Sequence, residues 1–273
     1  MKETIKIHVL HCGQVQVDIA LPFRQKTLNP VAYTGIFRSK RHQVILPVSA
    51  YLIRHPKGVA LIDTGWHTDL RGNQIKYLGR LHYWINKAIL PERQAINEQL
   101  SEFGIKPKDL DYVVLSHLHS DHVSGLKLLS ESKNIIVSEE ELKAAQKDKL
   151  RYIHHMWKDV NLKTFQMSSS EYGPQRRSFD LFGDDSVVLV HVPGHTPGLV
   201  ATIIQNNGKF VLLTSDCGYA TKSWEKMILP GVMINKKQLI ESLYWEKEMS
   251  QKSNCIKVIA NHDPDTMPQT IEV

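Results

Sequence analysis

The sequence predicts an α+β fold in which two β-sheets pack face to face and helices cover their outer faces. Runs of β-branched or alternating residues open each half of the chain, and segments with helical spacing follow them. A sheet must bury its apolar face against another layer, so this order favours two packed sheets with external helices. The chain has 273 residues, 42% of them hydrophobic, which is enough for one large core. We therefore expect a single domain over residues 1–273.

The first half begins with predicted strands. They cover residues 5–10, 43–55 and 59–65. Residues 66–91 are irregular and rich in aromatic side chains, so we expect a loop with a short helix. Ordinary packing is the preferred role for this segment, with a substrate lid or a dimer contact as alternatives. A helix is expected over 94–103, because apolar residues recur at helical spacing and Gly104 supplies a stop signal.

Strands and helices then alternate along the rest of the chain. We expect strands at 111–117, 134–138, 186–194, 200–204, 209–216 and 256–262, and helices at 122–129, 139–149 and 236–251. Asn206-Asn207-Gly208 forms the turn of a hairpin, because these residues tolerate positive φ. Residues 150–180 are polar and are expected to be irregular.

Composition argues against several classes of protein. Apolar runs are too short to span a membrane. Glu3 and Lys6 interrupt the stretch that a secretory signal would need, so we expect a cytoplasmic protein. Three widely spaced cysteines without a CxxC pair argue against disulfides and against a thiolate zinc site. The net charge of +6 is spread along the chain without an aromatic-studded basic stripe, so no nucleic-acid partner is expected.

The string Ser-His-Leu-His-Ser-Asp-His at 116–122 carries four candidate metal ligands. His117 and His119 lie two residues apart at the end of a strand, so both imidazoles point to the same side. Asp121 and His122 follow at the start of a helix and face a neighbouring point, where a second ion would lie. A single histidine on an apolar strand is usually a core residue, but four ligand types within six residues are hard to explain by packing.

Three further polar residues follow apolar strands. They are His195 within a Pro-Gly-His-Thr-Pro-Gly turn, Asp216 after a Phe-Val-Leu-Leu-Thr-Ser run, and His262 near the last predicted strand. Each alone is compatible with an ordinary loop residue, but together with the string they place imidazoles and carboxylates on one rim of the sheets. Such ligands suit Zn²⁺, and iron, cobalt or manganese are also compatible. We expect two Zn²⁺ ions, with Asp216 as the carboxylate that bridges them.

These residues, with Asp63-Thr64-Gly65 upstream, resemble the metallo-β-lactamase superfamily across nearly the whole chain. The resemblance implies an αββα sandwich of two mixed sheets. It also implies one metal site made of His117, His119 and His195, a second made of Asp121, His122 and His262, and Asp216 shared between them. Asp63 would lie behind the site and orient one of the ligands.

Within that superfamily the sequence is most similar to the N-acyl homoserine lactonases, which are quorum-quenching enzymes. Tyr219 stands three residues after Asp216, where those lactonases have a tyrosine that helps to hold the lactone carbonyl oxygen. The alternative for Tyr219 is a loop aromatic packed on the surface. Ser120 departs from the family, because several such lactonases have a bulkier apolar residue there. The chain also ends soon after His262, without the helical domain expected of a glyoxalase II type thioesterase.

The resemblance implies a metal-dependent hydrolase, a lactonase acting on carboxylic esters. A hydroxide that bridges the two metals would attack the lactone carbonyl, with Asp121 as general acid/base and Tyr219 beside the oxyanion. Three alternatives keep the site but change the substrate, to a pyridoxine-derived lactone, a thioester or a phosphodiester. A binding protein that has lost catalysis is less favoured, because all the ligand positions hold competent residues. The expected partner is a small lactone or ester, and a homodimer is conceivable.

Overall fold

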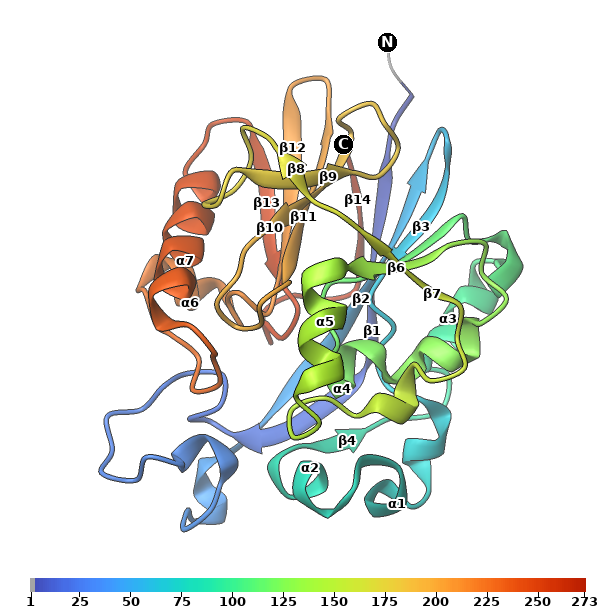
Figure 1. Ribbon diagram of the computed structural model, residues 1–273. Helices are drawn as coiled ribbons and strands as arrows, with labels where there is room; N and C mark the ends of the chain where they lie inside the picture. Colours follow the sequence, from blue (N-terminus) through green and yellow to red (C-terminus); the bar gives the residue numbers. More distant parts are fainter. Residues whose placement is uncertain (1–2) are drawn as a thin grey trace.

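The computed structural model describes residues 3–273 and contains two β-sheets packed face to face between layers of helices (Figure 1). The first sheet contains β1 (Lys6–Asp18), β2 (Gln43–His55), β3 (Gly58–Ile62), β4 (Lys87–Ile89), β5 (Tyr112–Leu115), β6 (Ile135–Ser138), β7 (Leu162–Phe165) and β14 (Gln269–Glu272). Its order is β14-β1-β2-β3-β5-β6-β7, and β4 pairs with β1. Pairing is antiparallel from β14 to β3 and parallel from β3 to β7.

The second sheet has the order β13-β12-β11-β10-β9-β8. Its strands are β8 (Ser168–Ser169), β9 (Arg177–Asp180), β10 (Val187–His191), β11 (Val200–Asn206), β12 (Lys209–Ser215) and β13 (Cys255–Ala260). Only β12 and β13 pair in parallel, so their carboxyl ends lie side by side. This pairing brings the residues that follow both strands to one edge of the sheet.

The helices are short except for the one that covers the second sheet. They are α1 (Gln74–Leu78), α2 (Arg80–Ile85), α3 (Ile96–Glu102), α4 (Ser120–Val123), α5 (Glu139–Lys147), α6 (Thr221–Glu225) and α7 (Lys236–Ser250). Six 3₁₀ helices cover Ala32–Thr34, Lys40–His42, Thr68–Arg71, Pro107–Asp109, Ser124–Leu129 and His154–Met156. None of the helices in residues 3–273 is both long and apolar enough to cross a bilayer.

Three apolar layers hold the sandwich together. The central layer lies between the sheets and joins residues such as Ile53 and Val114 of the first to Leu189 and Val211 of the second. A second layer packs the first sheet against α3 and the segment around α4, and a third packs the second sheet against α6 and α7. The predicted arrangement of two mixed sheets with external helices is therefore confirmed.

Three local expectations need correction. Residues 150–180 are not irregular throughout, because β7, β8 and β9 lie within them. The segment 66–91 contains α1, α2 and β4. The helix expected at 122–129 is one α-helical turn, α4, followed by a 3₁₀ helix. Close packing explains this tight path, since the amide of Gly125 donates a 2.8 Å hydrogen bond to the carbonyl of Gly65.

Candidate metal centre

All seven residues expected to bind metal come together at one end of the sandwich. His117 and His119 follow β5, and Asp121 and His122 lie in α4. The other three come from the second sheet: His195 from the β10–β11 turn, Asp216 from the end of β12 and His262 from beyond β13. The centre therefore lies where the strand ends of both sheets meet.

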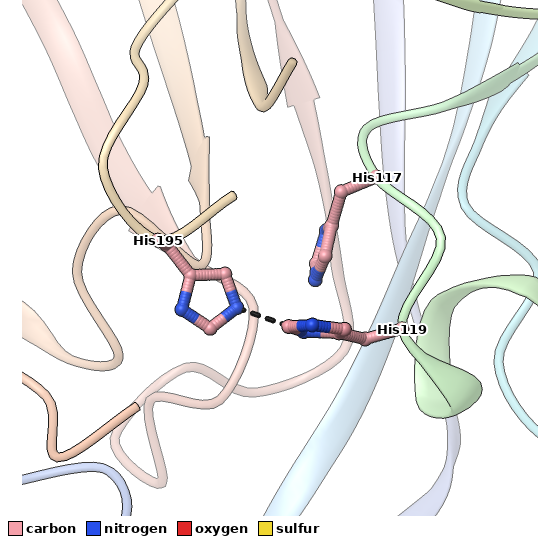
Figure 2. Close-up of side chains that lie close together, drawn as sticks. All are labelled: His117, His119 and His195. Atoms are coloured by element: carbon pink, nitrogen blue, oxygen red, sulfur yellow. Dashed lines mark hydrogen bonds between the residues drawn. The ribbon is translucent and has the colours of Figure 1, made fainter. Parts of the chain in front are cut away.

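The candidate ligand atoms form three overlapping groups, each with its atoms within 4.8 Å of one another. The groups are His117, His119 and His195; His117, His122 and Asp216; and Asp121, His122 and His262. Figure 2 shows the first group, with three imidazoles that point toward one another. The His195 Nε2 and His119 Nδ1 atoms are 3.0 Å apart.

Asp216 lies between the two sides of the centre. Its Oδ2 atom is 3.9 Å from His117 Nε2 and 3.5 Å from His195 Nε2. Its Oδ1 atom is 3.1 Å from His122 Nε2 and 3.2 Å from His262 Nε2. Each carboxylate oxygen thus faces a different set of imidazoles, which is the arrangement expected of a carboxylate shared by two cations.

Several ring nitrogens are aimed at the centre by hydrogen bonds on their far side. His195 Nδ1 lies 3.0 Å from the Val232 carbonyl, and His262 Nδ1 lies 2.7 Å from the Pro47 carbonyl. A carbonyl oxygen only accepts, so in both rings Nδ1 donates. In the neutral ring Nε2 is then left with a free lone pair that faces the centre.

Asp63 fixes a further ring from behind. Its Oδ2 atom is 2.8 Å from His122 Nδ1 and accepts a 2.7 Å hydrogen bond from the Ser116 hydroxyl, while Oδ1 accepts from the Ser116 amide at 2.8 Å. The carboxylate is buried, and Asp63 has a left-handed φ of 60° directly after β3. This unusual backbone turns the side chain toward His122.

Burial and charge keep part of the centre neutral and ready to bind cations. Burial first, and neighbouring imidazoles next, hold the pKa of His117 and of His119 well below the usual histidine value. Among the side-chain atoms of the centre, four buried ones have no hydrogen-bond partner within residues 3–273, namely Nε2 of His117, His122 and His262 and Oδ1 of Asp216. Buried polar atoms are rarely left unpaired. The donor set therefore fits two cations bound by nitrogen and oxygen.

Tyr219 is buried beside the centre, so the alternative of a surface aromatic is wrong. It is 5% exposed, and its ring stacks on His262 with centroids 5.1 Å apart. Burial, followed by the charge of Asp216, raises the pKa of Tyr219 well above the usual tyrosine value. Its hydroxyl is therefore a neutral hydrogen-bond donor at any physiological pH.

A cavity of about 450 Å³ opens next to Asp121, Asp216 and Tyr219. Its apolar walls come from several segments and include Val15, Val17, Leu21, Leu46, Leu81, Ile85, Leu150, Val232 and Met233. The aromatic-rich segment 66–91 thus lines the cavity through Leu81 and Ile85, while its role as a dimer contact stays a prediction. The walls from β1 and from the loop at 231–233 were not foreseen from the sequence.

Comparison with known proteins agrees with this geometry. The model of the metallo-beta-lactamase superfamily matches residues 44–237. The chain belongs to the metallo-beta-lactamase superfamily. Two relatives of this chain, one from Agrobacterium fabrum and one from a Bacillus species, confirm its resemblance to the lactonase branch.

The N-acyl homoserine lactonase AttM of Agrobacterium fabrum is 28% identical over 223 residues, covering 81% of this chain and 83% of the relative. An N-acyl homoserine lactonase of a Bacillus species is 30% identical over 226 residues, covering 80% and 82%. A solved N-acyl homoserine lactone hydrolase, with N-hexanoyl-L-homoserine bound at its catalytic metal centre, aligns with a TM-score of 0.77 and 24% identity over 95% of this chain and 94% of that one. The relatives place the chain among the hydrolases of the superfamily, and the solved structure confirms the fold.

Proposed function

We propose that this protein is a dinuclear metal-dependent lactonase that opens the ring of N-acyl homoserine lactones. The observation that carries the proposal is the position of Asp216, whose two oxygens face different sets of imidazoles beside an apolar cavity. The lactonases of Agrobacterium fabrum and of the Bacillus species support the choice of substrate by their similarity.

Each ion would have its own ligands and share one carboxylate. His117, His119 and His195 would hold one ion, Asp121, His122 and His262 the other, and Asp216 both. Imidazole and carboxylate ligands without a thiolate favour Zn²⁺, although iron, cobalt or manganese would also suit them. When bound, the two ions would supply Lewis acidity for a carbonyl and would make water a nucleophile near neutral pH.

The protein's own residues would orient the substrate and move the proton. The neutral Tyr219 hydroxyl would donate a hydrogen bond to the lactone carbonyl oxygen, where negative charge develops. The Asp121 side chain is 13% exposed and lines the cavity, so it can take a proton from the nucleophile and pass it to the departing ring oxygen. The apolar walls would receive the acyl chain and exclude water.

The cavity disfavours a phosphodiester substrate. Among its lining residues in the described part of the chain, Arg151 is the one lysine or arginine. A phosphodiester carries a negative charge, and a basic anion-binding pocket beside the metals would favour it. The neutral lactone with an apolar chain therefore matches the walls better.

We further propose that the chain works as one domain in the cytoplasm. Ligands from both sheets contribute to the centre, so neither sheet would build it alone. Cys12 and Cys217 are buried free thiols and Cys255 is a partly buried free thiol, which suits a reducing compartment.

The test measures ring opening by purified, zinc-loaded protein. The substrates are N-acyl homoserine lactones of several chain lengths, a pyridoxine-derived lactone, a thioester and a phosphodiester. We expect the acyl homoserine lactones to be the best substrates and both His117→Ala and Asp121→Asn to abolish activity. His154→Ala is the control, because this histidine is exposed on a 3₁₀ helix outside the centre. Full activity in metal-stripped His117→Ala protein would refute the proposal.

A further inference from the structure

Glu141 is a buried carboxylate that takes no part in the chemistry proposed above. It lies in the first turn of α5 and its side chain is 0% exposed. Its Oε1 atom accepts a 3.1 Å hydrogen bond from the Leu118 amide, and its Oε2 atom accepts a 3.1 Å hydrogen bond from the Gly198 amide. Each oxygen therefore holds the backbone of a different, distant segment.

Both segments carry histidines of the same ligand group. Leu118 stands between His117 and His119, and Gly198 follows the turn that carries His195. One carboxylate thus links the two loops that supply all three imidazoles shown in Figure 2. Gln and Asn side chains offer one acceptor oxygen, so only a carboxylate can accept from both amides in this geometry.

The neighbourhood of Glu141 adds a second contact to the same turn. The Ser138 hydroxyl donates a 2.7 Å hydrogen bond to the Gly198 carbonyl. The amide and the carbonyl of Gly198 are therefore both hydrogen-bonded to side chains at the start of α5. A Cβ atom at Gly198 would lie 2.2 Å from the Glu141 amide nitrogen. The turn with His195 can approach α5 this closely only because residue 198 is glycine.

Burial of this carboxylate is unfavourable on its own. Burial raises the pKa of Glu141, and no salt bridge to it occurs within residues 3–273. An apolar side chain would satisfy the packing of α5 without this desolvation penalty. The interactions that offset this penalty come first from the Thr196 side chain and the amides of Leu118 and Gly198, all three in the metal-centre loops, and then from the Tyr152 side chain.

We propose that Glu141 is a positioning residue that sets the distance of His195 from His117 and His119, and thereby the affinity of the ion bound by these three histidines. This inference rests on the proposed dinuclear centre. It predicts different effects on the two ions, because Glu141 accepts no hydrogen bond from Asp121, His122 or His262, the residues of the second site.

The experiment compares Glu141→Gln with Glu140→Gln in the full chain. Glu140 is the preceding glutamate on α5, and it pairs with Arg177 at 2.6 Å instead of with the loops. Zn²⁺ affinities come from competition with a chromogenic chelator, the absorption spectrum of the Co²⁺-loaded protein reports coordination, and heating of the metal-free protein reports stability. If Glu141→Gln fails to fold, Glu141→Asp, which keeps both oxygens but shortens the side chain, takes its place.

We expect Glu141→Gln to lower the affinity for one of the two ions by about 10- to 100-fold and to change the Co²⁺ spectrum. The second ion should keep its wild-type affinity, and Glu140→Gln should match the wild type in both metal affinities and in the Co²⁺ spectrum. The inference is overturned if both ions keep wild-type affinity in folded Glu141→Gln, or if both weaken equally in parallel with lost stability. Absence of metal binding by the wild-type protein would instead refute the proposed function, and this inference with it.

Discussion

The hydroxyl of Ser215 donates a hydrogen bond of 2.7 Å to the hydroxyl of Ser116, and this bond joins the two sheets directly beneath the candidate metal centre. The Ser116 hydroxyl in turn donates a hydrogen bond to the Asp63 carboxylate, which also contacts His122 Nδ1. Asp63 and Ser215 both have left-handed φ values, 60° and 51°. Such backbone costs about 1–3 kcal/mol per residue and persists only where its surroundings fix it.

Ser116→Ala should therefore destabilise the protein and loosen the centre. The change leaves the buried Ser215 hydroxyl without its acceptor and removes a donor from Asp63, so we expect a loss of about 1–3 kcal/mol in the free energy of unfolding. Urea titration of the metal-free protein measures this loss. Ser101→Ala is the matched control, because Ser101 is exposed on α3 and its hydroxyl donates a hydrogen bond to the Asn97 carbonyl of the same helix. Equal stabilities of the two variants would contradict the role of Ser116.

Tyr219→Phe should slow ring opening without releasing metal. Loss of one hydrogen-bond donor to a developing oxyanion costs roughly 100-fold or more in kcat in comparable sites, and the phenyl ring keeps the stacking on His262. Because the pKa of Tyr219 is raised, the ratio of wild-type to variant rates should stay constant up to about pH 9. Steady-state kinetics across pH measure this ratio. Tyr172→Phe, which alters a hydroxyl that accepts from Gln205 away from the centre, should leave the rate unchanged.

Ser120→Leu should shift the preference toward short acyl chains. Ser120 lines the cavity and its hydroxyl accepts a 3.3 Å hydrogen bond from Asn86 Nδ2. A leucine there would occupy space that a long chain needs, so kcat/KM should fall by about 10-fold or more for long chains relative to short ones. The measurement is kcat/KM over a series of chain lengths, with Ser120→Ala as the control that removes volume. An unchanged chain-length profile would show that the acyl chain lies elsewhere.

Asp184 should give the stability of the protein a component that depends on pH. Burial opposes its ionisation, but Lys57, at 2.7 Å, and Ser186 outweigh burial and lower the pKa of Asp184 to about 2. A carboxyl with a lowered pKa stabilises the fold above its unfolded value of 3.8, and this stabilisation disappears as pH falls through about 2. The Asp184 side chain is 28% exposed, so solvent screening limits the contribution to about 1 kcal/mol.

The matching experiment is denaturant unfolding of Asp184→Asn at several pH values. We expect the variant to be less stable than the wild type at neutral pH, and the difference to shrink as pH falls through about 2. Glu131→Gln, a change at an exposed glutamate, should track the wild type at every pH. A difference that persists at the lowest pH would mean that packing, and not charge, is responsible.

The candidate site was predictable because its residues follow strands. Four of the candidate ligands lie in one short string, and parallel pairing of β12 with β13 brings Asp216 and His262 to the same edge. The cavity was not predictable in this way. Val15 and Val17 alternate along β1 as core residues do, and only the three-dimensional structure shows that they face a ligand-sized space.

Other features that the sequence did not predict have local causes. β8 and β9 are short and mostly polar, so their strand pattern is too weak to recognise. Glu141 belongs to a run of three glutamates that looks like a solvated helix start, although only this one of the three is buried. Periodicity places a residue on a helix, but long-range packing decides which face the protein covers.

The final strand also has a consequence for handling the protein. After β13 in the second sheet, the chain crosses to the first sheet, and residues 269–272 pair with Lys6, Ile7, His8 and Val9. Without these last residues, the backbone amides and carbonyls along the start of β1 would form an open edge. Such an edge accepts strands from other molecules. C-terminal truncation would thus promote self-association at a place remote from the catalytic machinery, and loss of soluble protein could be mistaken for loss of function.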